Sequence, residues 1–526
     1  MTRRLQWWRA AALLIPACLS SACSSDAGPF LPGYASFDLL IAGGTVIDGR
    51  GGQPFEGDVL VHDGSIVFVG DVPDARLAGR VTRKIDASGK MVTPGFIDLH
   101  AHGDPLQTPA FENFLAMGVT TITLGQDGSS PPTASIRDWL QSVDDAGIGP
   151  NLAMFVGHGT LRELAGIGRE SNPGDAAIAD LLELLSTQLE YTFGLSTGLE
   201  YNPGLNANSD ELQAMAQRVG QHDRLIMSHL RNEDDDQIEA AIAELLDQGR
   251  FARVHIAHLK SVYGKGSTRA AEILAVLDAA RDDGVRVTAD VYPYSASYTT
   301  IAIVFPEWAK TADDFAAARR DRRDELESYL RARIARRNGP EATLLGTEPY
   351  TGKTLAQLSH ELEMPFEQVL IDEVGPGGAS GAYFVMDAGL QATLLADEFV
   401  GVCSDGSPTG FHPRGHGTFA RVVERHVMQE KLLTLPQAVQ KMTSFAAGVL
   451  GLADRGAIDV GMAADLLVFD PARVRETATY PQPHQLAEGF DVVIVNGSIA
   501  REQGRLSDAL HGRVLLPTSG VYVYDR

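Results

Sequence analysis

Five side chains of the kinds that bind metal ions stand at the ends of apolar runs in this chain of 526 residues. His100 and His102 form a His-x-His pair. Residues two apart on an extended strand point the same way, so both imidazoles can face one ion. His229, His258 and Asp405 end three later runs. Imidazole and carboxylate ligands suit Zn²⁺, with Mn²⁺, Fe²⁺ and Co²⁺ as alternatives. The sequence therefore predicts a divalent metal site.

The runs that carry these residues belong to a longer alternation between residues 93 and 450. Eight strand-like runs, separated by helical patterns, span residues 95–100, 120–125, 152–158, 192–196, 224–229, 253–258, 286–292 and 400–405. Such alternation indicates βα units around a parallel sheet, and eight strands close a (β/α)₈ barrel. Barrel enzymes place their active sites at the carboxyl ends of the strands, which is where the candidate ligands stand.

The stretch between the seventh and eighth runs, from residue 293 to 399, is much longer than the other connections. It contains a charged, helical pattern over residues 313–337 and further helical stretches at 354–373. We predict a helical insertion at about residues 300–395 that covers the barrel mouth. The alternative is a solvent-facing helical subdomain that takes no part in the chemistry.

Both ends of the chain have short strands and tight turns instead of βα units. Residues 37–92 include a hairpin with Asp63-Gly64 at its tip. Residues 464–498 have the same pattern of short apolar strands separated by turns. We therefore predict an α/β protein in which residues 37–92 and 451–526 together form a small β-sandwich domain beside the barrel.

Charge and cysteine content exclude several classes of protein. The chain has 44 basic and 68 acidic residues, giving a net charge of −24, and it has no basic block. Phosphate contacts need clustered Lys and Arg, so we expect no nucleic-acid partner. Three cysteines build neither a disulfide scaffold nor a four-thiolate zinc site.

The first 22 residues have the pattern of a signal peptide, with Arg3, Arg4 and Arg9 before an apolar run. Cys23 follows Leu-Ser-Ser-Ala, which resembles a bacterial lipoprotein cleavage site. We expect Cys23 to be lipidated, with a plain secretory signal or an uncleaved anchor as alternatives. The protein would then be exported to the periplasm or cell surface and held at the membrane only by this lipid.

The order His-x-His, His, His, Asp resembles the amidohydrolase superfamily, and Pro94-Gly-Phe-Ile-Asp-Leu-His-Ala-His is close to its first-strand signature. Other phrases resemble, more narrowly, the N-acyl-D-amino-acid deacylases, or D-aminoacylases. These phrases are Gly118-Val-Thr-Thr, Gly157-His-Gly-Thr-Leu-Arg, Gly194-Leu-Ser-Thr-Gly-Leu-Glu-Tyr, Ser228-His-Leu-Arg-Asn-Glu, Ala257-His-Leu-Lys, Asp290-Val-Tyr-Pro-Tyr, Ser404-Asp-Gly, His412-Pro-Arg-Gly-His-Gly-Thr-Phe and Gly461-Met-Ala-Ala-Asp-Leu-Leu-Val-Phe-Asp. The resemblance implies a hydrolase with one or two Zn²⁺ ions per chain.

One position departs from the deacylase pattern. These enzymes usually carry a cysteine ligand in a Gly-Asn-Cys-Gly phrase after the second strand, whereas this chain has Gly-Gln-Asp-Gly with Asp127 in that place. Glu200, after the fourth strand, stands where other amidohydrolases place a carbamylated lysine or a bridging glutamate. No lysine lies between Met91 and Lys260, which excludes a carbamylated lysine there. We favour Glu200 as the bridging ligand, with Asp127 as the alternative.

The resemblance also implies roles for other side chains. Asp405 would accept the proton of the attacking water and deliver it to the leaving amine. Lys260, with Tyr292 or Tyr294, would hold the substrate α-carboxylate, and Arg414 would add a second cation. The implied reaction is hydrolysis of the amide of N-acyl-D-amino acids, or of dipeptides with a C-terminal D-residue. The alternatives are a dipeptidase or cyclic-amide hydrolase of the same superfamily and, more remotely, a non-catalytic lipoprotein that binds ligands.

Overall fold

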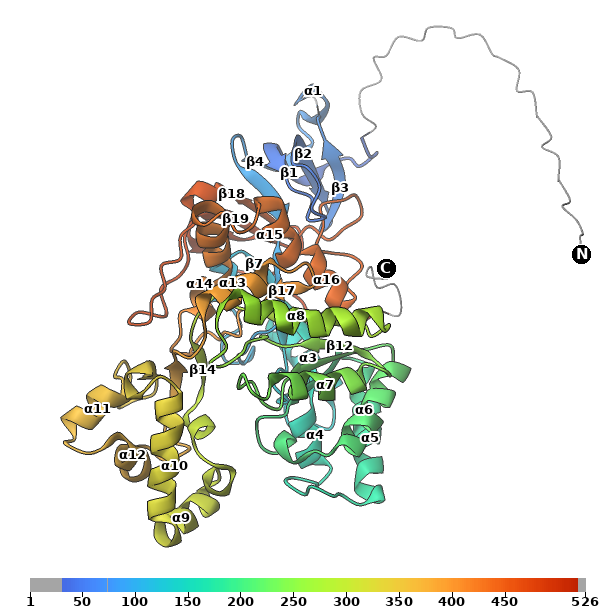
Figure 1. Ribbon diagram of the computed structural model, residues 1–526. Helices are drawn as coiled ribbons and strands as arrows, with labels where there is room; N and C mark the ends of the chain where they lie inside the picture. Colours follow the sequence, from blue (N-terminus) through green and yellow to red (C-terminus); the bar gives the residue numbers. More distant parts are fainter. Residues whose placement is uncertain (1–30, 73, 519–526) are drawn as a thin grey trace, which may run out of the picture.

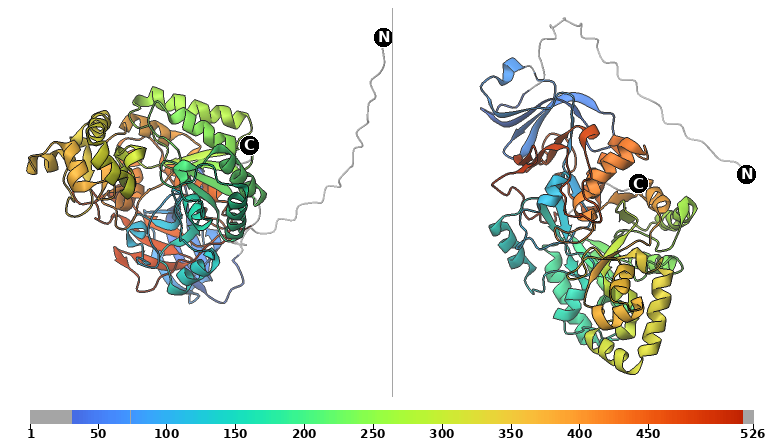
Figure 2. Two further views of the ribbon diagram at one scale, coloured as in Figure 1. Left: turned by 90° about the horizontal axis from the view of Figure 1, so that it is seen from below. Right: turned by 90° about the vertical axis from the view of Figure 1, so that its left-hand side faces the viewer.

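The structure, a computed structural model, describes residues 31–72 and 74–518. The predicted signal peptide and Cys23 lie outside these residues. A barrel forms the middle of the molecule, a β-domain lies at one end, and the insertion lies at the other (Figure 1). The two further views show the same arrangement, with the first and last strands of the chain together in the β-domain (Figure 2).

Eight parallel strands form the barrel, as predicted. They are β6 (Phe96–Asp98), β7 (Val119–Leu124), β8 (Asn151–Met154) continued by β9 (Val156–Gly157), β10 (Gly194–Gly198), β11 (Leu225–His229), β12 (Arg253–Ile256), β13 (Val287–Val291) and β17 (Val400–Val402). Pairing runs β6-β7-β8 and β9-β10-β11-β12-β13-β17. A parallel bridge between Ala101 and Gly406 joins the first strand to the last. Nearly all strand residues are buried because helices cover the barrel from outside.

The covering helices follow the strands in sequence. They are α2 (Glu112–Ala116), α3 (Ile136–Ala146), α4 (His158–Leu164), α5 (Asp175–Leu189), α6 (Ser209–Gln221), α7 (Ile238–Gln248), α8 (Gly266–Asp282), α13 (Ala388–Ala396), α14 (Arg414–Arg421) with its π-helical continuation η6 (Val422–Gln429), α15 (Leu435–Met442) and α16 (Ser444–Leu450). Local signals set their starts: the Asn208 side chain accepts from the N–H of Glu211 at the start of α6. Within the described ranges, no helix has the length and apolar character needed to cross a membrane.

Strands from both chain ends form the β-domain. They are β1 (Phe37–Val46), β2 (Phe55–His62), β3 (Ser65–Gly70), β4 (Val81–Asp86), β5 (Met91–Pro94), β18 (Leu466–Phe469), β19 (Phe490–Val495), β20 (Ser498–Glu502) and β21 (Arg505–Leu506), with the short helix α1 (Asp74–Leu77). One connected sheet runs β21-β20-β19-β18-β5-β1-β2-β3, and β4 also pairs with β1. Leu39 and Val61 share a buried cluster with Leu466 and Ile494, so the two halves pack over a common core.

The chain leaves the β-domain before its end. Gly512 and Val514 form bridges with Ile148 and Leu152 of the barrel, and Leu515 is buried in the cluster of the barrel interior. Residues 512–515 therefore lie against the barrel, although the sequence assigned everything after residue 451 to the β-domain.

The insertion contains a sheet as well as helices, which corrects the helical prediction. Its strands are β14 (Ser297–Thr300), β15 (Thr343–Leu345) and β16 (Ser380–Tyr383), and its helices are α9 (Ala312–Asp321), α10 (Arg323–Arg336), α11 (Leu355–Glu361) and α12 (Phe366–Val369) with its π-helical continuation η5 (Leu370–Val374). The sheet is antiparallel in the order β14-β16-β15. Each strand has only three or four residues and little apolar alternation, so the sequence offered no strand signal.

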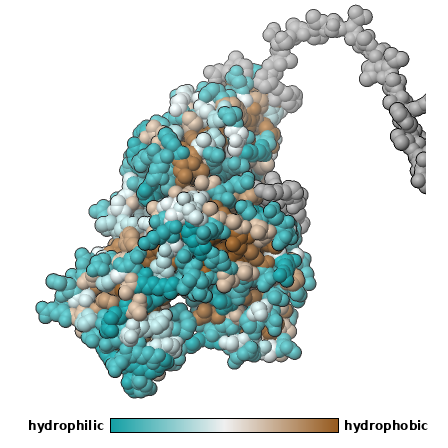
Figure 3. Space-filling model, viewed as in Figure 1, coloured by the Kyte–Doolittle hydropathy of each residue, from teal (hydrophilic) through white to brown (hydrophobic). Residues whose placement is uncertain are grey.

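Helix α10 ties the insertion to the barrel. Leu326, Leu330 and Ile334 lie four residues apart on one buried face, in a hydrophobic cluster that also contains Tyr292 at the end of β13. The remaining faces of α10 are charged, and the insertion surface is largely hydrophilic in Figure 3. The surface is hollowed between the insertion and the barrel (Figure 3).

Candidate active site

A cavity of about 910 Å³ opens at the carboxyl ends of the barrel strands. Residues of the insertion, including Tyr298, Ile303 and Arg337, complete its wall, so the insertion takes part in the site. The sequence analysis predicts eleven side chains that bind metal or substrate, and all of them except His100 and Tyr294 line this cavity. His100 is fully buried directly beneath it.

Asp127 reaches the cavity on a tight turn after β7. Asp127 has a φ of 53°, and the flanking Gly125 and Gly128 have φ values of 83° and 73°. A Cβ at Gly125 would stand 2.1 Å from the carbonyl oxygen of Phe155. The Gly-Gln-Asp-Gly phrase therefore folds this way because its glycines accept a left-handed backbone in a crowded place.

Two other candidate ligands also have left-handed backbones. His258 has a φ of 38° and Asp405 a φ of 48°. The N–H of His258 donates to Asp290 Oδ1 at 2.5 Å, and the N–H of Asp405 donates to the carbonyl of His100 at 2.8 Å. A left-handed backbone costs conformational free energy at a non-glycine residue, so it persists only where surrounding contacts enforce it. Such residues are typical of functional sites.

The first group of ligand atoms converges between β6, β7 and β17. His100 Nε2 lies 3.2 Å from His102 Nε2 and 3.4 Å from Asp127 Oδ1. His102 Nε2 lies 3.5 Å from Asp127 Oδ2 and 3.1 Å from Asp405 Oδ1. Donor atoms of a tetrahedral zinc site, each bonded at 2.0–2.1 Å, are about 3.3 Å apart. These spacings suit one divalent ion.

A second group shares the Asp127 carboxylate. His229 Nδ1 lies 3.0 Å from His258 Nε2, and Asp127 Oδ1 lies 3.5 Å and 3.3 Å from these two nitrogens. One ligand atom from each of His100, Asp127, His258 and Asp405 falls within 4.8 Å of the others, and the same holds for His229, Glu233 and His258. The donors therefore form two neighbouring groups that could hold divalent ions; His258 belongs to both groups, and the Asp127 carboxylate lies within 3.5 Å of imidazoles in each.

The electrostatics of the cluster agree with a cation site. Burial acts to lower the pKa of His229, but the carboxylates of Glu233, Asp127 and Glu200 raise it to about 10. Burial likewise opposes protonation of His102, and its hydrogen bonds to Asp127 and Asp405 raise its pKa to about 9. Carboxylates that hold protons on imidazoles this strongly would hold a divalent ion in their place.

Glu200 occupies a different position from Asp127. Its Oε2 lies 3.3 Å from Nε2 of His229, whereas Asp127 faces Nδ1 of the same ring. Glu233 Oε2 lies 3.9 Å from the same nitrogen. Glu200 is absent from both ligand groups. The geometry thus favours Asp127, the alternative in the sequence analysis, over Glu200 as the shared carboxylate, because Asp127 lies within 3.5 Å of four imidazole nitrogens and Glu200 contacts one.

Asp405 is bound from two sides. Its Oδ1 faces His102, while its Oδ2 forms an ion pair with Arg414 Nη1 at 2.6 Å. Burial acts to raise the pKa of Asp405, but the Arg414 guanidinium together with His258, His102 and His100 outweighs it and holds that pKa far below its usual range. Asp405 is therefore an ionised acceptor at the edge of the metal cluster. Arg414 also donates to the carbonyl of Tyr298 at 3.0 Å, which connects it to the insertion.

Lys260 and Tyr292 lie together on the cavity wall. Lys260 Nζ is 2.5 Å from Glu233 Oε1, 2.8 Å from His258 Nδ1 and 5.8 Å from the centre of the Tyr292 ring. The sequence left Tyr292 and Tyr294 as alternatives, and the structure separates them. Tyr294 donates to Glu476 Oε1 at 2.7 Å, behind the cavity wall.

Glu233 is the residue that sequence reasoning missed. It is buried, pairs with Lys260, and belongs to one of the two possible ligand groups. It stands at the end of the Ser228-His-Leu-Arg-Asn-Glu phrase, so the signal was present. Asp290, which accepts from the N–H of His258 and lies 2.9 Å from His255 Nε2, was also not given a role.

Comparison with known proteins identifies the family. The profile of the Amidohydrolase family matches residues 83–501, which include the whole barrel and insertion. The chain belongs to the amidohydrolase family. Within this family, N-acyl-D-glutamate deacylase of Alcaligenes xylosoxydans xylosoxydans is 34% identical over 487 residues, covering 88% of this chain and 93% of that protein. N-acyl-D-aspartate deacylase of the same organism is 33% identical over 519 residues, covering 93% and 96%.

A solved amidohydrolase structure has the same fold. It is N-acyl-D-glutamate deacylase from Bordetella bronchiseptica, complexed with zinc and a phosphonate inhibitor that mimics the tetrahedral intermediate. It is 30% identical, covers 91% of this chain and all of its own, and superposes with a TM-score of 0.78. The resemblance to N-acyl-D-amino-acid deacylases predicted from the motifs is confirmed.

Proposed function

We propose that this amidohydrolase hydrolyses the amide bond of N-acyl-D-amino acids with the help of one or two zinc ions. The observation that carries the proposal is the convergence of four imidazoles on Asp127, next to an ionised Asp405, in a cavity of substrate size. The zinc and the N-acyl-D-amino acid substrates named for its relatives agree with this donor set.

In the proposed site His100, His102, Asp127, His229 and His258 hold the metal. A divalent ion there would lower the pKa of water towards neutrality and polarise the scissile carbonyl. Asp405 Oδ1 accepts the proton of the attacking water, because Arg414 keeps this carboxylate ionised. The same oxygen then returns the proton to the nitrogen of the leaving amino acid, so that the amide becomes a carboxylate and an amine.

The amino-acid half of the substrate is placed by the cations of the wall. Lys260 and Arg414 both lie near the Tyr292 ring, at 5.8 Å and 4.8 Å from its centre. Both can share the α-carboxylate while they keep their own partners, Glu233 and Asp405. A substrate carboxylate held here places its amide towards the metal cluster and Asp405.

A substrate panel tests the proposal. Purified protein supplied with Zn²⁺ is assayed with N-acetyl-D-amino acids, their L-enantiomers, and dipeptides with C-terminal D- or L-residues. Hydrolysis confined to substrates that release a D-amino acid, as N-acetyl-D-amino acids or as dipeptides with a C-terminal D-residue, is the expected result. Preference for L-residues in either series would instead assign the protein to another activity of its superfamily.

We propose further that the protein is exported and anchored through Cys23. The support comes from the sequence alone: a basic start, an apolar run and the Leu-Ser-Ser-Ala-Cys phrase. Replacing Cys23 by Ala should move the protein from the membrane fraction to the soluble exported fraction. Mass spectrometry should find a lipid on Cys23 of the native protein, and an unmodified Cys23 would contradict the anchor.

A further inference from the structure

One arginine of the cavity wall has no counter-ion. Arg337, which follows α10, is 3% exposed and lines the cavity. Its Nε is buried without a hydrogen-bond partner. Throughout residues 31–72 and 74–518, no carboxylate lies within salt-bridge distance of its guanidinium. The ring of Tyr383 covers one face of the guanidinium, 5.0 Å away, and such stacking leaves the N–H edge free.

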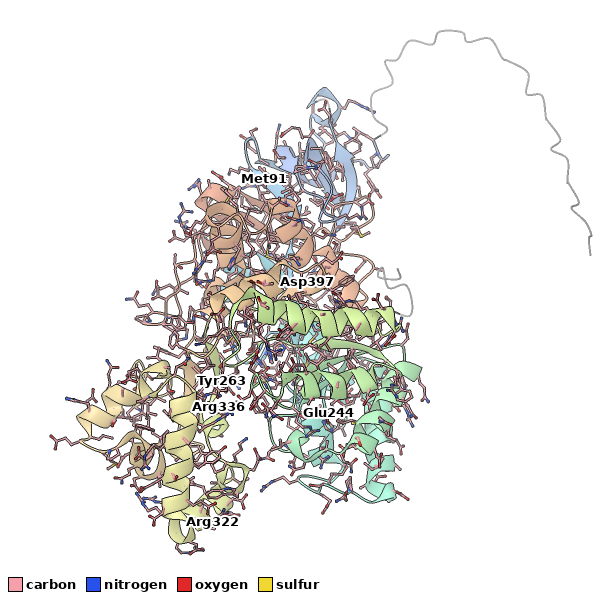
Figure 4. All side chains as sticks on the ribbon, in the orientation of Figure 1. Met91, Glu244, Tyr263, Arg322, Arg336 and Asp397 are labelled. Carbon is pink, nitrogen blue, oxygen red and sulfur yellow. The ribbon has the colours of Figure 1, made fainter. Side chains whose placement is uncertain are left out.

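The neighbouring arginines of α10 differ in this respect. Arg333 pairs with Asp234 at 2.6 Å, and Arg336 pairs with Asp236 at 2.9 Å. Arg336 also stacks over Tyr263, where α10 meets the barrel (Figure 4). The acidic side chains at this junction are therefore taken by Arg333 and Arg336. A buried cation is stabilised when it pairs with an anion. For Arg337 we infer that this anion enters through the cavity.

Arg337 lies on the part of the cavity wall that the insertion contributes. From Tyr383, the last residue of β16, which stacks against Arg337, the chain continues to Met386, whose sulfur accepts from the Tyr292 hydroxyl at 3.7 Å. In the insertion sheet Tyr383 is the register partner of Ser297, the residue before Tyr298. Arg414, which contacts Tyr298, lines the same cavity. Arg337 therefore shares the cavity with Lys260 and Arg414 but, unlike them, has no carboxylate partner among the described residues.

We propose that Arg337 binds the side-chain carboxylate of the substrate, so that the enzyme prefers N-acyl-D-amino acids with an acidic side chain. The inference rests on the proposed function. The planar fork of the guanidinium matches a carboxylate with two parallel hydrogen bonds. A neutral amide of the same shape can accept only one of them, so charge and geometry together discriminate glutamate from glutamine.

The test compares N-acetyl-D-glutamate with its isostere N-acetyl-D-glutamine in the zinc-loaded, full-length enzyme. The readout is the ratio of the two kcat/KM values in the native protein and in Arg337→Met. Arg336→Met is the matched control, because it removes the same charge one residue away from the cavity wall. The native ratio should exceed one. Arg337→Met should lower it about 10- to 100-fold, the range for a charge-assisted hydrogen bond. Arg336→Met should leave it unchanged.

General damage to the fold lowers kcat/KM for both substrates together. It therefore leaves the ratio of the two values unchanged and does not imitate the expected result. If Arg337→Met does not fold, Arg337→Gln serves with the same expectation. A native ratio of one or less, or an unchanged ratio in either Arg337 variant, would overturn the role of Arg337. Hydrolysis of N-acetyl-D-glutamine without preference for glutamate leaves the proposed function intact. Absence of hydrolysis for both of these and for N-acetyl-D-methionine removes the proposed function and this inference together.

Discussion

Replacing Asp127 by Asn tests the assignment of the shared carboxylate. The change keeps the size and shape of the side chain and removes its charge. Asp127 lies 3.3–3.5 Å from four imidazole nitrogens, whereas Glu200 lies 3.3 Å from a single imidazole nitrogen, Nε2 of His229. We therefore expect Asp127→Asn to weaken metal binding much more than the matched change Glu200→Gln.

The magnitudes follow from these positions. One unit of charge at about 4 Å, at an effective dielectric constant of about 20, is worth about 4 kcal/mol. Loss of the Asp127 charge should thus weaken metal affinity by about 10³-fold. A carboxylate that only supports a ligating histidine contributes about 10- to 100-fold, which is the expectation for Glu200→Gln.

The assay is competition for Zn²⁺ against a chelator of known affinity, with the metal content of the dialysed protein measured in parallel. Asp127→Cys is a useful third variant. A thiolate restores the negative charge and the ligand that related deacylases carry, so this variant should bind Zn²⁺ more tightly than Asp127→Asn. If Glu200→Gln loses more metal than Asp127→Asn, then Glu200 is the shared ligand and the geometric reasoning is wrong.

Three further changes have definite expectations. Asp405→Asn should keep its metal yet lose about 10²- to 10⁴-fold in kcat, as for removal of a general acid/base, and normal turnover would exclude that role. Burial raises and Arg414 lowers the pKa of Asp405, so Arg414→Met should raise this pKa and move the acid limb of the kcat/KM profile to higher pH; a limb that stays in place would show that another group controls it. Glu211 pairs with the buried Arg162 at 2.5 Å and with His158 at 2.7 Å, so Glu211→Ala should cost about 3–5 kcal/mol in denaturant unfolding, and a cost near zero would refute the buried network.

Much of the scaffold could be predicted because its signals are local. The barrel strands are continuous buried runs, and their carboxyl ends carry His100, His229, His258 and Asp405, so their order along the chain places them at one rim. The strands of the insertion were not predicted because they carry no strand pattern; β14, for example, has the sequence Ser-Tyr-Thr-Thr and no apolar face.

What the sequence left open at the site concerns the direction in which side chains point. Asp127 and Glu200 both follow strands, and the sequence does not say which nitrogen of His229 each one meets. Tyr292 and Tyr294 are two residues apart, but β13 ends at Val291, so strand alternation no longer relates them. Glu233 was visible in its motif, yet its pairing with Lys260 depends on contact between two loops.

The central claim is metal-dependent deacylation of D-amino acids, and one measurement addresses it directly. The zinc-loaded protein is incubated with racemic N-acetylglutamate, and the free amino acid is followed by chiral chromatography with and without a chelator. The account predicts release of D-glutamate until half of the substrate is consumed, with N-acetyl-L-glutamate left behind and no release from chelator-treated protein. Release of L-glutamate, or release that persists after the metal is removed, would contradict it.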